Sequence, residues 1–381
     1  MKSQLLLLLL LLAACSSQSA AQRSPGGAEG RAGGNSEAVV SAAPAPGFAT
    51  GKPVPSPPAA SPATAGIPTP APPPPGPVTP APKFQEYPVP KGEHPHDVAP
   101  TADGMVWYTA QVSGEVGRLD PGTGQAKQIK LGQGSAPHGI IVGPDRALWI
   151  TDGGLNAIVR VDPATEEVRR FPLPAGQGRA DLNTATFNKQ GRLWFTGQNG
   201  IYGRLEPGSG KIDVFDAPRG RGPYGMTTTK DGGLYFASLA GSYVGRIDPD
   251  SSKATILEPA TAKQGARRVW ADSRGRVWVS EWDGGKLAVY DPANGAWQEF
   301  IIGPPDLKAM PYAVYVDERD DVWVSEWRSN ELLRYEPSRG VFGSFPFPTE
   351  RAEVRQLAGR FGEVWGAESG TDKLVVARFG Q

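Results

Sequence analysis

Cysteine, histidine and net charge are all scarce in this sequence. One cysteine among 381 residues excludes an internal disulfide and a multi-cysteine zinc site. The 39 basic residues are balanced by 39 acidic ones, so the chain has no excess of positive charge with which to bind duplex DNA or an anionic membrane surface. We therefore expect no nucleic-acid partner.

A long transmembrane run is also missing. The longest apolar stretch, Leu5–Leu12, is shorter than the roughly 18 to 20 residues that a membrane-spanning helix needs, and its charged start and small-residue end are typical of a signal peptide. The motif Leu12-Ala13-Ala14-Cys15 resembles the bacterial lipobox. This implies that residues 1–15 are a lipoprotein signal peptide and that Cys15 becomes the lipid anchor. Ser16, in place of Asp, favours the outer membrane facing the periplasm by the same resemblance, and an ordinary secreted protein is the alternative.

Residues 16–82 consist mainly of Ala, Gly, Ser and Pro and contain 17 prolines. Such a segment has too few large apolar side chains to bury a core, so we predict a disordered linker. Fully extended, it would reach about 200 Å at ~3.1 Å per residue. We interpret it as a tether, and a proline-rich ligand for another protein is the alternative.

The remaining residues, 83–381, repeat one phrase seven times, as in VWYTAQVSGEVGRLDP and LWITDGGLNAIVRVDP. The aromatic anchors of the phrase are 41 to 45 residues apart: Trp107, Trp149, Trp194, Tyr235, Trp278, Trp323 and Trp365. A period of this length indicates a repeat architecture. Each unit contains four short alternating runs and no helical period, so each is predicted to be a four-stranded antiparallel sheet. Seven such sheets form an all-β, seven-bladed β-propeller.

The ends of the repeat region support a closed ring. The last unit stops after its third strand, whereas an extra strand-like run at 83–88 precedes the first unit. We expect this N-terminal strand to complete the last blade, which leaves no exposed sheet edge. Six units carry Asp-Pro or Glu-Pro at one place, which suits a turn with proline at its second position between the third and fourth strands.

Polar and aromatic side chains are predicted to surround the central channel. Counting back 11 residues from each anchor reaches the start of the innermost strand in six blades, and counting back 10 does so in the seventh. The residues at these positions are His96, His138, Asn183, Tyr224, Arg267, Tyr312 and Arg355. A second set stands three residues after each anchor: Ala110, Asp152, Gly197, Ser238, Glu281, Glu326 and Glu368. Because the first two strands of a blade are antiparallel, both sets should meet on one face as a polar funnel.

Histidine is concentrated in this funnel. His96 and His138 open the inner strands of two adjacent blades, and Asp152 belongs to the second of these blades. We expect this cluster to be functional, since imidazole and carboxylate groups together perform acid–base and metal chemistry. The alternative is that the arginines and glutamates of one blade only pair with each other. Trp282 and Trp327 either stack a ligand at the rim or pack between loops.

The repeated phrase, with Pro-His-Gly-Ile opening one strand and Leu-Trp-Ile-Thr-Asp in the next, resembles the streptogramin B lyase family, also called virginiamycin B lyase, over all of 83–381. The resemblance implies a Mg²⁺-assisted elimination that opens an ester of a cyclic depsipeptide without attack by water. It implies that His138 is the general base that takes the proton alpha to the ester carbonyl, that His96 binds or polarises the substrate, and that Asp152 holds Mg²⁺. The remaining polar positions would bind substrate: Asn183, Tyr224, Arg267, Tyr312, Arg355, Glu281 and Glu326.

Three positions depart from the family pattern. Asp152 is shorter than the family's glutamate, Ala110 offers no second carboxylate, and Asn183 stands where the family has a tyrosine with a phenolic proton. Two main functions therefore stay open: an exported lyase, or a non-catalytic, envelope-tethered propeller that binds a peptide, glycan or protein on its funnel face. A lactonase-type hydrolase is a third, although the inner ring carries no acid for its calcium site. We expect a monomer that binds a small cyclic peptide or envelope ligand and touches the membrane only through its lipid anchor.

Overall fold

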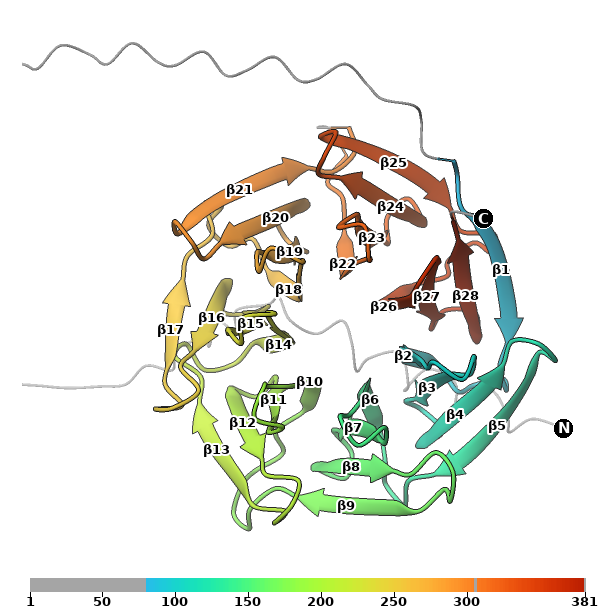
Figure 1. Cartoon of the computed structure of the whole chain (residues 1–381), viewed down its shortest axis with the longest axis vertical. Helices are drawn as coiled ribbons and strands as arrows, with labels where there is room; N and C mark the ends of the chain where they lie inside the picture. The colour runs from blue at the N-terminus through green and yellow to red at the C-terminus, as the bar shows by residue number, and fades with distance from the viewer. Residues whose placement is uncertain (1–79, 305–306, 380–381) are drawn as a thin grey trace, which may run out of the picture. The chain divides into compact units, whose positions relative to one another are not determined.

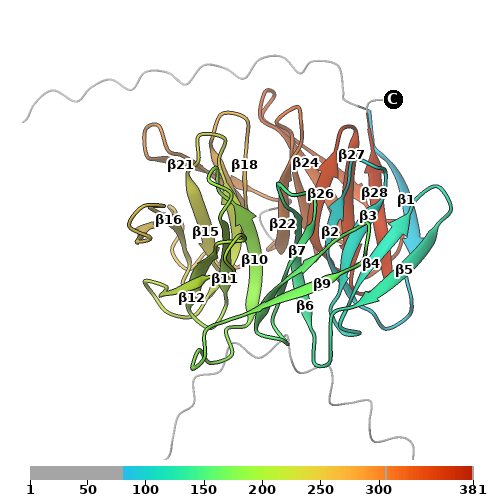
Figure 2. The same cartoon turned by 60° about the horizontal axis from the view of Figure 1, so that its bottom comes forward.

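The computed structural model describes residues 80–304 and 307–379, which form a seven-bladed β-propeller (Figure 1). Each blade is a sheet of four antiparallel strands, with the innermost strands around the axis and the outermost at the rim (Figure 1, Figure 2). The predicted all-β propeller is thus confirmed. The predicted signal peptide, its Cys15 and all but the end of the linker 16–82 lie outside the described residues. Within the described part of the chain, no helix combines the length and apolarity required to cross a membrane.

Four strands make up each blade, counted from the axis outward. The innermost strands are β2 (Pro95–Pro100), β6 (Pro137–Val142), β10 (Leu182–Phe187), β14 (Pro223–Thr228), β18 (Ala266–Ala271), β22 (Pro311–Val316) and β26 (Val354–Arg360). The second strands are β3 (Val106–Ala110), β7 (Leu148–Asp152), β11 (Leu193–Gly197), β15 (Leu234–Ser238), β19 (Val277–Glu281), β23 (Val322–Glu326) and β27 (Glu363–Glu368). The third strands are β4 (Glu115–Asp120), β8 (Ala157–Val161), β12 (Ile201–Leu205), β16 (Tyr243–Ile247), β20 (Lys286–Asp291), β24 (Glu331–Glu336) and β28 (Lys373–Arg378). The outermost strands are β5 (Gln125–Lys130), β9 (Val168–Pro172), β13 (Ile212–Asp216), β17 (Ala254–Leu257), β21 (Ala296–Ile301), β25 (Val341–Pro346) and β1 (Lys83–Pro88).

The last blade combines strands from both ends of the propeller sequence. Strand β1 pairs antiparallel with β28, from Lys83 opposite Arg378 to Pro88 opposite Lys373. Within this pair Glu86 Oε2 lies 2.5 Å from Lys373 Nζ. Strand β1 therefore fills the outer position that a consecutive fourth strand fills in the other blades (Figure 1).

Each aromatic anchor is buried between neighbouring blades. Trp149 packs with Phe171 of its own blade and with Leu193 and Phe195 of the next, and only 2% of its surface is exposed. Burying one such side chain contributes roughly 2 to 3 kcal/mol of transfer free energy. Repeating the anchor in every blade therefore builds a core that continues around the ring.

The Asp-Pro pairs form the predicted turns between third and fourth strands. Asp120 ends β4, its carbonyl accepts a hydrogen bond from the Gly124 N–H at 2.8 Å, and its carboxylate accepts one from the Gly122 N–H at 2.8 Å. Gly124 has a φ of +72°, a conformation that glycine adopts without strain. These acidic residues therefore have a structural role.

Candidate functional site

Seven side chains fill the channel at the level where the inner strands begin. Each is the second residue of its strand, as predicted: His96, His138, Asn183, Tyr224, Arg267, Tyr312 and Arg355. The imidazoles of His96 and His138 stack with their centroids 3.7 Å apart. The hydroxyls of Tyr224 and Tyr312 are 2.6 Å apart, and the guanidinium of Arg267 lies 3.5 Å from the Tyr312 ring centre. The expected open funnel is closed at this level, because stacked rings and guanidinium groups occupy the axis and leave most of the set buried.

Hydroxyl groups two residues after the anchors hold this ring in register. Thr109 Oγ1 accepts a hydrogen bond from the Asp97 N–H at 3.0 Å and donates one to the His138 carbonyl of the next blade at 2.8 Å. The same two bonds recur at Thr151, Thr196, Ser280 and Ser325. A register shift in each inner pair, such as that between Pro95 and Val98, brings the second and third residues of the strand to the axis together.

The third residues of two inner strands form an ion pair across the axis. Arg268 of β18 donates to both carboxylate oxygens of Asp97 in β2, at 2.7 and 3.3 Å. Asp97 Oδ1 also accepts a hydrogen bond from His96 Nδ1 at 2.8 Å, and all three side chains are buried. A carboxylate that holds one imidazole nitrogen orients the ring and stabilises it once it is protonated. Asp97 and Arg268 were not among the site residues predicted from the sequence, although each is a charged residue directly after a ring position.

The hydrogen bonds assign the proton positions of both imidazoles. A carboxylate only accepts, so His96 carries its proton on Nδ1, and Nε2 is its acceptor nitrogen. Asn183 Nδ2 lies 3.0 Å from His138 Nε2, and the Asn183 side-chain oxygen accepts from Thr184 Oγ1 at 2.9 Å. An amide nitrogen only donates, so Nε2 of His138 accepts and its proton lies on Nδ1. That Nδ1 has no hydrogen-bond partner among the described residues.

Both imidazoles are neutral near pH 7. Burial lowers the pKa of His96 well below its usual range, and the guanidinium groups of Arg355, Arg268 and Arg267 lower it further. Burial also lowers the pKa of His138, and the neighbouring His96 adds to this effect. A neutral imidazole can accept a proton, which a general base requires.

A phenol lies beside His138 although Asn183 occupies the position of the family tyrosine. The ring of Tyr224, in the blade after Asn183, stands edge-on to His138 with centroids 5.9 Å apart. Its hydroxyl accepts a hydrogen bond from Arg267 at 3.1 Å and is hydrogen-bonded to Tyr312. Burial raises the pKa of Tyr224. Burial also acts to raise the pKa of Tyr312, but the nearby guanidinium groups, first among them Arg267, outweigh it and lower that pKa.

Asp152 does not join the histidine pair. Its carboxylate accepts hydrogen bonds from one hydroxyl and three backbone N–H groups, those of Ser135, Ala136, Gly154 and Leu155. These bonds tie the loop before β6 to the loop after β7. The ligand atoms that do lie together, within 4.8 Å of one another, belong to His96, Asp97 and His138. The carboxylate beside the histidines is thus Asp97, one residue along the inner strand, and not the predicted Asp152.

Three glutamates at the position equivalent to Asp152 have different surroundings. Glu326 behaves like Asp152 and accepts hydrogen bonds from the N–H groups of Met310, Arg328 and Ser329. Glu281 is 0% exposed, neither of its carboxyl oxygens has a partner among the described residues, and burial raises its pKa to about 8. Burial raises the pKa of Glu368 to about 7. Glu281 and Glu326, which were predicted to bind substrate, are therefore both buried.

Trp282 and Trp327 pack over the part of the ring formed by Arg267 and Tyr312. Trp327 stacks on Tyr312 with centroids 4.6 Å apart, and its Nε1 donates a hydrogen bond to the Val354 carbonyl at 2.8 Å. Trp282 stands edge-on to Trp327 at 5.5 Å and lies 4.6 Å from the guanidinium carbon of Arg267. The contacts of both indoles are therefore packing contacts within the protein, which was one of the two roles predicted for them; the other was to stack a ligand at the rim.

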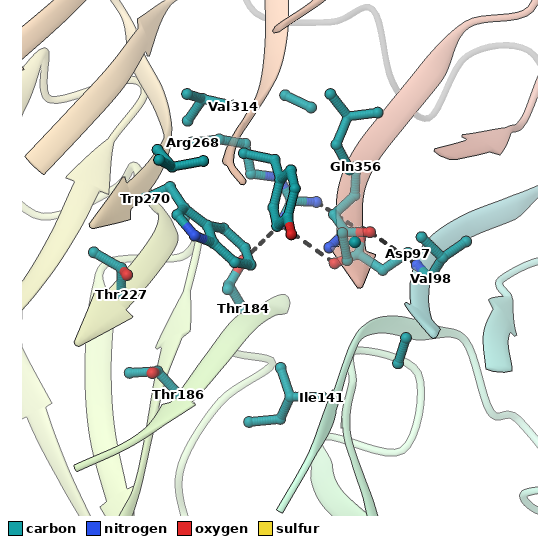
Figure 3. A pocket seen from close by; sticks show the side chains of 18 of the residues that line it. Asp97, Val98, Ile141, Thr184, Thr186, Thr227, Arg268, Trp270, Val314 and Gln356 are labelled. Carbon is teal, nitrogen blue, oxygen red and sulfur yellow. Dashed lines mark hydrogen bonds and ion pairs between the residues drawn. The ribbon is translucent and has the colours of Figure 1, made fainter. Parts of the chain in front are cut away.

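A cavity of about 660 Å³ opens towards the opposite end of the inner strands (Figure 3). Its innermost charged groups are Asp97 and Arg268, which face each other across the axis. The walls combine hydroxyl and apolar side chains, including Thr184, Thr186, Thr227, Ile141, Trp270 and Val314. Phe361 belongs to the lining and is 88% exposed. The layer formed by Asp97 and Arg268 thus separates this cavity from the ring.

The residues at this centre do not fit Mg²⁺. This ion takes oxygen ligands in near-octahedral geometry, whereas the closest group of ligand atoms offers two imidazoles and one carboxylate. Both oxygens of that carboxylate already bind Arg268, and those of Asp152 bind its own loops. The guanidinium groups around His96 add further positive charge.

Comparisons with known proteins agree with this architecture. A family model described as the virginiamycin B lyase family matches residues 76–302. A solved streptogramin B lyase has 23% identity over 78% of this chain and 98% of its own, with a TM-score of 0.71. A catalytically inactive variant of virginiamycin B lyase from Staphylococcus aureus, solved with quinupristin, has 22% identity over 78% of this chain and 99% of its own, with a TM-score of 0.72. YCF48 bound to D1 peptide has 12% identity over 80% of this chain and 100% of its own, with a TM-score of 0.63.

No curated protein matches the chain. At identities below a quarter, the solved structures show a shared fold and do not by themselves transfer an activity. The chemistry of this chain therefore depends on its own side chains.

Proposed function

The chain belongs to the virginiamycin B lyase family, and from this premise we propose that it is a carbon–oxygen lyase that opens an ester of a cyclic depsipeptide or a related substrate by elimination. The observation that carries the proposal is the buried Asp97–His96 pair stacked on His138. It provides an oriented, neutral base and a second imidazole that presents an N–H group. Elimination needs both, because one group must remove a proton while another stabilises the negative charge that develops.

In this mechanism His96 is the base. Its Nε2 removes a proton from a carbon next to a carbonyl group, the C–H electron pair forms a carbon–carbon double bond, and the neighbouring C–O bond breaks so that a carboxylate leaves. Asp97, held by Arg268, stabilises the imidazolium that forms, as in other carboxylate–histidine pairs. The Nδ1–H of His138 donates to the carbonyl oxygen as charge accumulates there.

These assignments exchange the roles that the family resemblance implied. His138 was expected to be the base, but its Nε2 accepts a hydrogen bond from Asn183 and its proton lies on Nδ1. His96 was expected to bind or polarise the substrate, yet the Asp97 contact leaves Nε2 as its acceptor nitrogen. We place the substrate against the ring beside His96 and His138, because Trp282 and Trp327 pack over the ring beside Arg267 and Tyr312.

Incubation of the full chain with a streptogramin B-type depsipeptide, followed by mass spectrometry, tests the proposal. Ring opening by elimination leaves the mass unchanged and creates a double bond that absorbs in the ultraviolet. We expect His96→Ala to lower kcat/KM by roughly 10²- to 10⁴-fold, because a general base contributes about that factor. A chelator should leave the rate of the wild-type protein unchanged.

The third histidine provides the matched control. His94 lies outside the pair, and its Nδ1 contacts the Ser369 carbonyl at 2.9 Å. Since its φ is +47°, His94→Asn is the suitable variant, because asparagine tolerates this conformation. This variant should keep full activity. A product that has gained one water, or a substrate that stays intact, would show that the chain is not a lyase for this class.

Recognition without catalysis is the second candidate, and the cavity of about 660 Å³ favours it. Cavities of this size that combine apolar walls with a few polar groups are typical small-molecule sites. Saturable binding of the intact depsipeptide, with no turnover and with equal affinity in wild type and His96→Ala, would support this function over the lyase.

A further inference from the structure

Three buried N–H groups at the centre of the channel lack an acceptor. They are Nδ1 of His138, Nε of Arg267 and Nε of Arg268, none of which has a hydrogen-bond partner among the described residues. All three side chains surround Tyr224, whose ring centre is 5.9 Å from the imidazole centre and 4.7 and 5.3 Å from the two guanidinium carbons. Buried donors are normally paired, so three unpaired donors around one ring indicate a place that an acceptor should fill.

The same place carries positive charge that no carboxylate of the described residues balances. Arg268 is paired with Asp97, and Arg355 lies 3.8 Å from Glu353, but Arg267 forms no ion pair with any residue that the structure describes. Its positive charge therefore has no carboxylate partner in the described part of the protein.

Aromatic rings, not carboxylates, surround Arg267. Its guanidinium carbon lies 3.5 Å from the ring centre of Tyr312, 4.7 Å from that of Tyr224 and 4.6 Å from that of Trp282. Glu281 lies on the paired strand opposite Ala266, and burial raises its pKa to about 8, so it is largely uncharged at neutral pH. Stacking on rings holds the guanidinium in place while its charge stays available to a ligand.

A ligand can approach this charge from the cavity. Arg268 lines the cavity at its inner end, with Thr184 and Gln356 beside it (Figure 3). The Arg268 side chain is 5% exposed and spans the layer between the cavity and the ring, since it contacts both Thr184 and the ring of Tyr224. An anion in the cavity therefore meets Arg268 first, and Arg267 and the Nδ1–H of His138 lie beyond it.

We propose that the channel centre is an anion-binding site, in which Arg267, Arg268 and the Nδ1–H of His138 bind a carboxylate or phosphate group of the ligand. The identity of the ligand rests on the proposed function. The site itself is tested by binding and not by turnover. A carboxylate is the group that an ester elimination releases, so the site would bind the acidic product end. The positive charge that favours an anion also disfavours Mg²⁺ at the same place.

Calorimetric titration of the full chain with inorganic phosphate, acetate and MgCl₂, in separate experiments at neutral pH, tests this site. We expect saturable binding of at least one anion and none of Mg²⁺, and the two anion experiments show which group is preferred. Arg267→Gln removes the charge and should weaken anion binding by at least tenfold. Arg267→Lys keeps the charge and should weaken it less, which separates loss of charge from loss of structure.

Arg169 provides the matched control. It stacks on Phe171 at 4.6 Å in the outer strand β9, far from the axis in Figure 1. Arg169→Gln should bind the anion as the wild type does. Failure of both anions to bind, equal binding in Arg267→Gln and wild type, or saturable Mg²⁺ binding would each overturn the proposal. Inactivity towards the depsipeptide together with anion binding would contradict the lyase function and leave the anion site standing.

Discussion

At the scale of single residues, surroundings decide what a carboxyl group does. Glu281 and Glu326 occupy the same place in two copies of Val-Trp-Val-Ser-Glu-Trp, yet Glu326 accepts three backbone hydrogen bonds and Glu281 is buried with neither oxygen paired among the described residues. Their chemistry therefore differs although the local sequence is identical. Repeat spacing could predict that both lie at the end of a second strand. It could not predict which of the two accepts hydrogen bonds from backbone N–H groups.

Glu281→Gln should remove a pH-dependent loss of stability. The folded-state pKa of Glu281 is about 8 against an ordinary value of 4.5, so between these values the folded protein keeps a proton that the unfolded chain has released. The stability contributed by this group is fully present below the unfolded pKa and is lost as the pH rises through about 8. The slope reaches at most about 1.4 kcal/mol per pH unit. Urea unfolding of wild type and variant at about pH 5 and about pH 9 measures it.

The pH dependence of stability has to be compared between the variant and the wild type, because burial also raises the pKa of Glu93 and Glu368 to about 7 and that of Asp321 to about 6. The wild type therefore has a slope from several groups, and subtraction isolates Glu281. Glu326→Gln is the control and should cost about 1 to 3 kcal/mol, because one of the two oxygens that accept backbone hydrogen bonds is replaced by an NH₂ group, which only donates. Equal pH behaviour of the two variants would refute the assigned surroundings.

The ring positions could also be predicted from the sequence, whereas the chemistry of the ring could not. Counting from the anchors located all seven side chains, because the repeat period fixes the register within a blade. The proton positions of His96 and His138 depend on Asp97 and on Asn183 of the next blade. Contacts between blades depend on how neighbouring sheets pack, and the sequence pattern of a single repeat does not determine that packing.

At the scale of strands, a hydroxyl in five of the seven second strands connects neighbouring blades. Alternation and turn residues predicted the strands, since these are local features. The hydroxyl contacts could not be predicted in the same way, because Thr151 accepts from Gly139 of its own blade and donates to the Asn183 carbonyl of the next. Two blades lack the group and have Ala237 and Ala367 at this position.

Thr151→Val should destabilise the protein by about 1 to 3 kcal/mol, because it leaves one buried N–H and one buried carbonyl without a partner. The variant should also move Asn183 and thereby shift the NMR signals of His138. Thr255→Val is a matched control, since Thr255 is exposed on the outer strand β17. Chemical denaturation measures both variants, and equal stability of the two would contradict the connecting role of this hydroxyl.

At the scale of the whole molecule, the ring is closed by a strand from the opposite end of the propeller sequence. Tyr87 of β1 is 4% exposed and stacks on Trp365 of β27 with centroids 5.5 Å apart. The first and last strands of the propeller are thereby joined in one sheet, which removes an unpaired edge.

Tyr87→Ala should therefore destabilise the propeller as a whole by about 3 to 5 kcal/mol, the cost of truncating a buried aromatic side chain. Thermal unfolding should show a single transition at a lower Tm. Phe361→Ala is the control, because Phe361 is 88% exposed and its loss should change stability by no more than about 0.5 kcal/mol. A Tyr87→Ala protein that melts like the wild type would mean that β1 does not hold the ring closed.

Nitrogen-15 NMR measures the protonation state of each imidazole, and the chain has only three histidines to resolve. The channel centre should hold two neutral imidazoles, with Nε2 of His96 available as a base and Nδ1–H of His138 available as a donor. We predict that neither imidazole titrates near its ordinary pKa, that each carries its proton on Nδ1, and that Mg²⁺ moves neither signal. Titration of either ring near the ordinary pKa of about 6.5, a proton on Nε2 of His96, or a saturable shift with Mg²⁺ would contradict the account.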